Sequence, residues 1–257
     1  MKQLGFFLSI GYLSIGLALS LLGLSVRAFD LPDLIERARP SVVGIGTYEA
    51  LRAPRNVLGG TGFIVGNGRQ VITNYHVAHA QEDITEKTQL VVFLGRGKNP
   101  DVRPAKLISQ DRFHDLALLE IEGAPGPALA LSDSVVREGQ AIALIGFPIG
   151  AILGLYPSTN AGIVSSISPI AMPQASTQTL SAEQIRRLRE PFEVFQLDAI
   201  AYPGNSGSPV FDLKSGQVIG VVNSVLARQS KEGLLKDPSA ITYAIPIRHV
   251  MKLLTAP

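Results

Sequence analysis

Residues 202–209, with the sequence YPGNSGSP, hold one serine between two glycines and two prolines. Glycine adopts backbone angles that are closed to residues with a Cβ, so this turn can present the Ser206 hydroxyl and aim successive N–H groups into one concavity. Such a hydroxyl suits attack on a carbonyl carbon, because the N–H groups of Gly204 and Ser206 would stabilise the resulting oxyanion. The alternative is an ordinary turn between strands. A base and an orienting acid elsewhere in the chain would favour catalysis.

His76 is the candidate base, because it directly follows the apolar run 71–74 and its imidazole can face a cleft while its neighbours stay packed. An imidazole is the side chain best matched to taking a serine proton near neutral pH. Asp115 is the preferred orienting acid. It heads the apolar run 116–119, where a partly buried carboxylate needs a partner such as an imidazole N–H. Asp111 is the competing acid.

Short β-strands joined by Gly and Pro turns must position these residues. Apolar runs with no convincing long helix between them predict antiparallel sheets and an all-β fold. The Pro/Gly connection 123–127 separates two sets of strands, which we expect to form barrel one over about 40–125 and barrel two over about 133–245. Residues 51–60 are expected to form a loop. The expected strands are 42–47, 61–65, 71–74, 90–94, 105–109, 116–121, 141–147, 162–167, 193–197, 209–211, 218–225 and 242–245.

Three short helices are predicted outside these strands. Asp30 and Pro32 favour a helix start, and Pro40 ends that helix. Residues 181–190 begin with a capping-box pattern and end before a proline, and residues 247–254 form the C-terminal helix.

Composition limits the classes of function. The 257 residues, 46% of them hydrophobic, suffice for one large all-β domain or two small ones. A formal net charge of +2 without a basic block argues against a nucleic-acid partner. The absence of cysteine excludes thiol catalysis and disulfides. The pair His76 and His79 lacks the glutamate of the HExxH zinc motif, so neither a metal nor another cofactor is expected.

Residues 1–28 combine Lys2, an apolar stretch over 4–26 and a small-residue cleavage site before Phe29, which indicates a cleaved export signal. The apolar stretch approaches the roughly 20 residues that span a bilayer, so an uncleaved anchor in the inner membrane is the alternative. Both readings place the remaining chain outside the cytoplasm, in the bacterial periplasm or secreted.

His76, Asp115 and Ser206 occur in the chain order of the chymotrypsin arrangement. The surrounding motifs are TGFIV at 61–65, ITNYHV at 72–77, DLALL at 115–119, TNAGIVS at 159–165, GNSGSP at 204–209, QVIGVVN at 217–223 and YAIPI at 243–247. With these motifs, residues 32–254 resemble trypsin-like serine proteases of the HtrA/Deg type.

This resemblance implies a double β-barrel whose cleft lies between the barrels. Ser206 would be the nucleophile, His76 the general base and then acid, and Asp115 its orienter, while the N–H groups of Gly204 and Ser206 would form the oxyanion hole. It also implies unfolded or flexible polypeptides as substrates, extracytoplasmic protein quality control, and a homotrimer formed through residues 29–35.

Three features depart from the family pattern. We expect a protease domain without the PDZ domain that HtrA proteins usually carry. Ser208 replaces the last glycine of GNSGGP, as in glutamyl endopeptidases of the same fold. Residues 170–191 look longer than the corresponding loop, and they either gate the cleft or form a surface insertion.

Specificity is expected from the residues before the nucleophile and from the strand after it. No charged residue occurs among them, so small or medium apolar P1 side chains are expected. These candidate substrate-binding residues are Ile200, Ala201, Tyr202, Val222, Asn223, Ser224 and Val225.

Two alternatives belong to other classes. An α/β-hydrolase could combine Ser206, Asp237 and His249, but Ser208 occupies the second glycine position of the required G-x-S-x-G elbow and a strand pattern follows. A catalytically silent barrel protein could instead bind unfolded chains in a chaperone-like manner.

Overall fold

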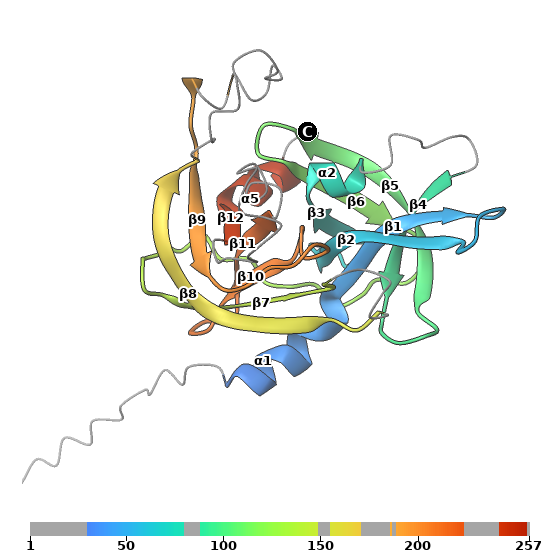
Figure 1. Ribbon diagram of the computed structural model, residues 1–257, viewed down its shortest axis with the longest axis horizontal. Coiled ribbons are helices and arrows are strands. Elements are labelled where there is room, and N and C mark those ends of the chain that lie inside the picture. The colour runs from blue at the N-terminus through green and yellow to red at the C-terminus, as the bar shows by residue number, and fades with distance from the viewer. Residues whose placement is uncertain are drawn as a thin grey trace, which may run out of the picture.

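The computed structural model describes residues 30–79, 88–148, 155–170, 186, 189–223 and 242–255. Its strands form two closed barrels of six antiparallel strands each (Figure 1). Barrel one contains β1 (Val42–Glu49), β2 (Asn56–Val65), β3 (Gln70–Thr73), β4 (Thr88–Leu94), β5 (Asp101–Asp111) and β6 (Leu116–Ile121). Barrel two contains β7 (Ala141–Gly146), β8 (Ser158–Pro169), β9 (Glu193–Asp198), β10 (Pro209–Asp212), β11 (Val218–Asn223) and β12 (Thr242–Pro246). The predicted all-β double-barrel fold is confirmed.

The two barrels share one topology. Barrel one has the order β1-β2-β3-β6-β5-β4 and closes by pairing β4 with β1. Barrel two repeats this order as β7-β8-β9-β12-β11-β10 and closes by pairing β10 with β7. In barrel one the end of β3 therefore lies beside the start of β6, and in barrel two the start of β10 lies beside the end of β11. The residues that flank these strand ends build the candidate site.

Strands that lie where the barrels meet are apolar on both faces, because successive residues point alternately into the core between the barrels and into the interior of one barrel. Phe63 and Val65 of β2 join the core between the barrels, whereas Ile64 between them faces the interior of barrel one. This alternation follows from the pleat of a strand, and it explains why such strands are apolar on both faces. Burial on both faces fixes the position of one barrel against the other.

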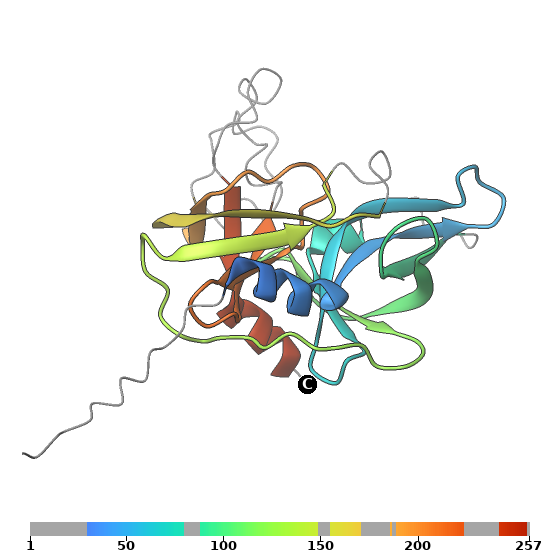
Figure 2. The ribbon, with the colours of Figure 1, turned by 90° about the horizontal axis from the view of Figure 1, so that it is seen from below.

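Two terminal helices cover the core between the barrels. Helices α1 (Leu31–Ala38, blue) and α5 (Ile247–Thr255, red) both lie outside the barrels (Figure 2). Leu34 of α1 and Val250 of α5 belong to that core. Both predicted terminal helices are therefore present and pack on their own chain.

The expected loop over 51–60 is wrong in its second half, because β2 begins at Asn56. This part of β2 pairs with β1 across a β-bulge between Ile45 and Gly46. Gly60 marks a close approach of two other segments of the chain and not a turn. A Cβ at Gly60 would lie 2.6 Å from Val77 Cγ1 and 3.2 Å from the Ser206 carbonyl oxygen. The other expected strands are present with ends shifted by a few residues.

Several predictions lie outside the described residues. They are the export signal over 1–28, most of the segment 170–191 with its helix, and Ser224 and Val225. Among the helices that are described, none is long and apolar enough to span a membrane.

Candidate active site

The adjacent ends of β3 and β6 bring His76 and Asp115 together. His76 lies on the short helix α2 (Tyr75–Ala78), which follows β3, and Asp115 directly precedes β6. The imidazole Nδ1 lies 2.6 Å from Asp115 Oδ2, and the backbone N–H of His76 donates to Asp115 Oδ1 at 2.9 Å. With Nδ1 held by the carboxylate, Nε2 is the ring nitrogen that can exchange a proton with a nucleophile.

Two asparagines and a backbone amide hold Asp115 from other directions. Asn223 Nδ2 donates to Asp115 Oδ2 at 2.7 Å, from the end of β11 in barrel two. The Asp115 carbonyl accepts bonds from Asn74 Nδ2 at 3.0 Å and from the Tyr75 N–H at 3.1 Å. These bonds stabilise a backbone φ of 55°, which few residues other than glycine adopt. The carboxylate is thus fixed on the imidazole edge.

The competing acid, Asp111, contacts a different imidazole. His114 Nδ1 lies 2.5 Å from Asp111 Oδ2, and the His114 N–H donates to Asp111 Oδ1 at 3.0 Å. Burial raises the pKa of Asp111, but the hydrogen bonds from His114 outweigh this effect and lower it below its ordinary value. Of the two acids, Asp115 is therefore the one that contacts His76.

The loop that carries Ser206 is a pair of tight turns. The Asn205 N–H donates to the Tyr202 carbonyl at 3.0 Å, and Gly204 has a φ of 98°. Proline at the second position and positive-φ glycine at the third are typical of a type II turn. Gly207 also has a positive φ, and a Cβ there would lie 2.0 Å from the Thr61 carbonyl oxygen. Both glycines are therefore required by the backbone path around Ser206.

Barrel one packs directly against this loop. The Thr61 N–H on β2 donates to the Ser206 carbonyl at 2.9 Å. Gly60, one residue earlier, lies close to both Ser206 and Val77 of α2. The Ser206 loop and the helix that carries His76 therefore meet at the same point of β2.

The expected specificity residues occupy different environments. Ile200 is exposed, and Ala201 and Tyr202 are half-buried. Val222 is fully buried in the core of barrel two. The side chain of Asn223 binds Asp115. This contact could not be predicted, because an asparagine at a strand end carries no distinctive sequence signal.

His249 does not join the serine loop, as the α/β-hydrolase alternative required. It lies on α5, and its ring stacks on that of His114 with centroids 3.8 Å apart. The pKa of His249 is lowered to about 3, mainly because the ring is buried and secondarily because His114 lies beside it. Asp237 lies outside the described residues. The antiparallel double barrel itself excludes the α/β-hydrolase fold.

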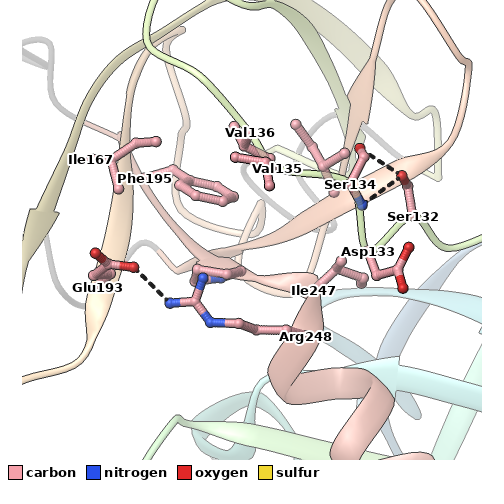
Figure 3. Close-up of a pocket in the computed structure, with 12 residues that line it drawn as sticks. Ser132, Asp133, Ser134, Val135, Val136, Ile167, Glu193, Phe195, Ile247 and Arg248 are labelled. Atoms are coloured by element: carbon pink, nitrogen blue, oxygen red, sulfur yellow. Dashed lines mark hydrogen bonds and ion pairs between the residues drawn. The ribbon is translucent and has the colours of Figure 1, made fainter.

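A pocket of about 350 Å³ opens at one end of barrel two, away from the triad candidates (Figure 3). Its apolar lining includes Val136 and Phe195, and four of its polar side chains are hydrogen-bonded in two pairs. The Ser132 hydroxyl donates to Ser134 Oγ at 2.8 Å, and Arg248 binds Glu193 at 3.0 Å. No imidazole lines this pocket, so it lacks a base for acyl transfer. Among the described residues, no three potential ligand side chains gather into a metal site.

Known proteins resemble the chain in sequence and in structure. The trypsin-like peptidase domain model matches residues 60–221. A protein of Halomonas elongata named "Probable periplasmic serine endoprotease DegP-like" is 32% identical over 73% of this chain and 32% of its own length. Human serine protease HTRA3 is 30% identical over 88% of this chain and 44% of its own length. The chain thus spans between about a third and a half of these relatives.

The crystal structure of Deg5 superposes with a TM-score of 0.60 and 26% identity, covering 86% of this chain and 90% of that chain. The predicted resemblance to HtrA/Deg proteases is confirmed. The matched model covers more than half of the sequence and includes His76, Asp115 and Ser206. The chain belongs to the trypsin-like peptidase domain family.

Proposed function

We propose that the protein is a serine endopeptidase in which Ser206, His76 and Asp115 form the catalytic triad. The observation that carries this proposal is the 2.6 Å contact between His76 Nδ1 and Asp115 Oδ2, at the point where α2 meets the Ser206 loop. A carboxylate in this position holds the imidazole in one tautomer and stabilises the imidazolium that forms when the ring takes a proton.

The reaction proceeds through an acyl-enzyme. Ser206 Oγ attacks the scissile carbonyl carbon while His76 Nε2 takes the hydroxyl proton, and the carbonyl oxygen becomes an oxyanion. The N–H groups of Gly204 and Ser206 donate to this oxyanion. His76 then gives its proton to the leaving amine as the C–N bond breaks. Water then gives a proton to His76 Nε2 and attacks the acyl carbon. The ester C–O bond breaks as His76 returns that proton to Ser206 Oγ, which restores the hydroxyl and releases the carboxylic acid.

Unfolded or flexible polypeptides are the proposed substrates, and small or medium apolar side chains the proposed P1 residues. The exposed Ile200 and the half-buried Ala201 and Tyr202 precede the nucleophile, and none of them could pair with a charged P1 side chain. Cleavage-site profiling of a peptide library should therefore be dominated by apolar P1 residues. Dominance of Arg, Lys or Glu would contradict this assignment.

A location outside the cytoplasm and a role in protein quality control are also proposed. The Halomonas relative is named as periplasmic, and residues 1–28 have the pattern of an export signal or an anchor over 4–26. A homotrimer formed through residues 29–35 remains a proposal from the resemblance. Leu34 of α1 is already buried against its own chain, so the exposed side of this helix would be the part available to a neighbour.

Digestion of unfolded casein tests the catalytic assignment. Wild-type protein should degrade casein, and Ser206→Ala should lower kcat by several orders of magnitude, because triad members act as a unit. Equal digestion by both proteins would contradict the assignment. Binding of casein without cleavage by the wild type would favour the chaperone-like alternative.

A further inference from the structure

We propose that Thr61 is a positioning residue that holds the two oxyanion-hole residues, Gly204 and Ser206, in place from barrel one. This inference rests on the proposed function and adds a residue to it. Thr61 lies on β2 and is fully buried. It touches neither the imidazole of His76 nor the carboxylate of Asp115 through the hydrogen bonds described above, so it acts through the loop.

The hydroxyl of Thr61 makes two hydrogen bonds. It donates to the Gly204 carbonyl at 2.7 Å and accepts from the Phe147 N–H at 3.0 Å, just beyond the end of β7. A hydroxyl has one proton, so the bond from Phe147 leaves that proton directed at Gly204. The oxygen thereby joins β2 of barrel one to two separate segments of barrel two.

The backbone of Thr61 makes two more bonds. Its N–H donates to the Ser206 carbonyl at 2.9 Å, and its carbonyl accepts from Thr73 Oγ1 at 2.7 Å. Thr73 ends β3, the strand that leads into the helix of His76. One residue therefore connects Gly204 and Ser206 with the strand that leads to the base.

Two of these bonds, those to the carbonyls of Gly204 and Ser206, combine with two backbone bonds of the loop to hold alternate peptide groups. Thr61 and Tyr202 hold the Gly204–Asn205 peptide at its two ends, and Thr61 and Val222 hold the Ser206–Gly207 peptide in the same way. The peptide that precedes each of these two, Pro203–Gly204 and Asn205–Ser206, carries the N–H of Gly204 or of Ser206. Oxyanion donors must lie within a few tenths of an ångström of their productive positions, and a shift of about 1 Å can cost about 100-fold in rate.

Other side chains of the loop do not provide an equivalent anchor. The amide of Asn205 and the hydroxyl of Ser208 are buried, and neither has a hydrogen-bond partner among the described residues. Both lie beside Thr61, because a Cβ built on Gly146 would contact all three side chains. Unlike the side chains of Asn205 and Ser208, the Thr61 hydroxyl therefore ties the loop to barrel one.

Thr61→Val tests the inference, because valine keeps the shape and the backbone N–H but removes the hydroxyl. We expect kcat for a peptide substrate to fall about 10- to 100-fold, with KM changed by less than about threefold. The inhibition constant of a peptide aldehyde, whose adduct with Ser206 places an oxygen in the oxyanion hole, should rise by the same factor as kcat/KM falls. Thr61→Ser, which restores the hydroxyl, should stay within about threefold of wild type.

Thr47→Val is the matched control. Thr47 is a buried threonine on β1 of the same barrel, and none of the contacts described for the nucleophile loop involves it. Its variant should retain wild-type kcat at a temperature where circular dichroism shows all variants folded. If Thr61→Val does not fold, Thr61→Ala compared with Thr61→Ser makes the same test.

Three results would overturn the inference: a kcat for Thr61→Val within threefold of wild type, an equal loss in Thr61→Ser, or a loss confined to KM. Failure of the proposed function looks different. Wild-type protein would then neither cleave the peptide nor react with a fluorophosphonate at Ser206, before any Thr61 variant is assayed.

Discussion

Both oxygens of the Asp115 carboxylate accept hydrogen bonds. Oδ1 accepts from the His76 N–H, and Oδ2 is shared by the His76 imidazole and the Asn223 amide. A buried carboxylate is costly unless such bonds satisfy it. Because Asn223 belongs to barrel two, this single carboxylate also links the two barrels. At the residue scale, the site is therefore a network in which each proposed catalytic group is held by a second residue.

Asn223→Ala should lower kcat by about tenfold. The variant removes one charge-assisted hydrogen bond, worth about 1.5–3 kcal/mol, and part of this is felt when the imidazolium forms. The bond between His76 and Asp115 remains, so the loss should be far smaller than for Ser206→Ala. Single-turnover kinetics with a peptide ester would measure the acylation rate directly. An unchanged rate in a folded variant would show that the Asn223 bond does not support catalysis.

At the element scale, the pairing of strand ends explains how distant segments meet. The end of β3 and the start of β6 bring His76 to Asp115, and the start of β10 and the end of β11 bring the Ser206 loop to Asn223. Short motifs at such ends could be recognised in the sequence, because glycine, histidine and aspartate interrupt apolar runs there. The order of strands within each barrel could not be predicted, because hydrophobic periodicity does not show which strands pair.

The contacts that residues inside strands make with the site could not be predicted from the sequence. Thr61 is a β-branched residue in an apolar run, and nothing in its local sequence distinguishes it from a strand residue that only packs. Gly60 was assigned to a loop, because propensity does not reveal that another chain segment passes close by. Contacts between the barrels decide both cases, and such contacts are absent from any local window of sequence.

Gly146→Ala should disturb the nucleophile loop from the end of β7. The new Cβ would lie 1.9 Å from Ser208 Oγ and 2.9 Å from Asn205 Oδ1. Overpacking of this kind costs about 1–3 kcal/mol, so we expect a lower unfolding midpoint together with a lower kcat. Adding Ser208→Gly removes the closer of the two atoms and should restore part of both losses.

Gly59→Ala is a suitable control for this double-mutant cycle, because a Cβ there would meet only the Ile45 carbonyl oxygen, at 3.8 Å. Denaturant unfolding of all four proteins would give the coupling free energy between positions 146 and 208. Additive effects of the two substitutions would mean that they do not meet in the folded protein.

At the scale of the whole molecule, α5 provides a contact between the two barrels that does not involve the candidate active site. It follows β12 of barrel two, yet His249 stacks on His114 in the turn between β5 and β6 of barrel one. Phe192 meets both rings edge-on. Both nitrogens of His249 are buried, and neither has a hydrogen-bond partner among the described residues. The charged groups that act on His249 are His114, Arg248, Lys252 and Asp111.

His249→Phe should make the protein less sensitive to acid. The pKa of His249 is lowered from 6.5 to about 3 in the folded state, so between these values the unfolded chain binds a proton that the folded chain does not. Stability is therefore highest above the unfolded pKa and falls as the pH drops toward 3. Between pH 7 and pH 5 this one group accounts for a loss of about 2 kcal/mol.

Denaturant unfolding at pH 7 and pH 5 checks this expectation, and phenylalanine preserves the aromatic stack during the comparison. The variant should lose less stability than wild type over that interval. The carboxylate of Asp111 titrates mainly below it, because its pKa lies under the ordinary value of 3.8. Equal losses in both proteins would show that His249 does not titrate as its burial requires.

The most direct test of the account is covalent labelling of the folded protein with a fluorophosphonate, read by intact mass and peptide mapping. We predict one adduct per chain, located on Ser206, abolished in Ser206→Ala and greatly slowed in His76→Ala, because the hydroxyl needs its base. A folded wild-type protein that stays unlabelled, or that is labelled equally fast without His76, would contradict the assignment of Ser206, His76 and Asp115 as a working triad.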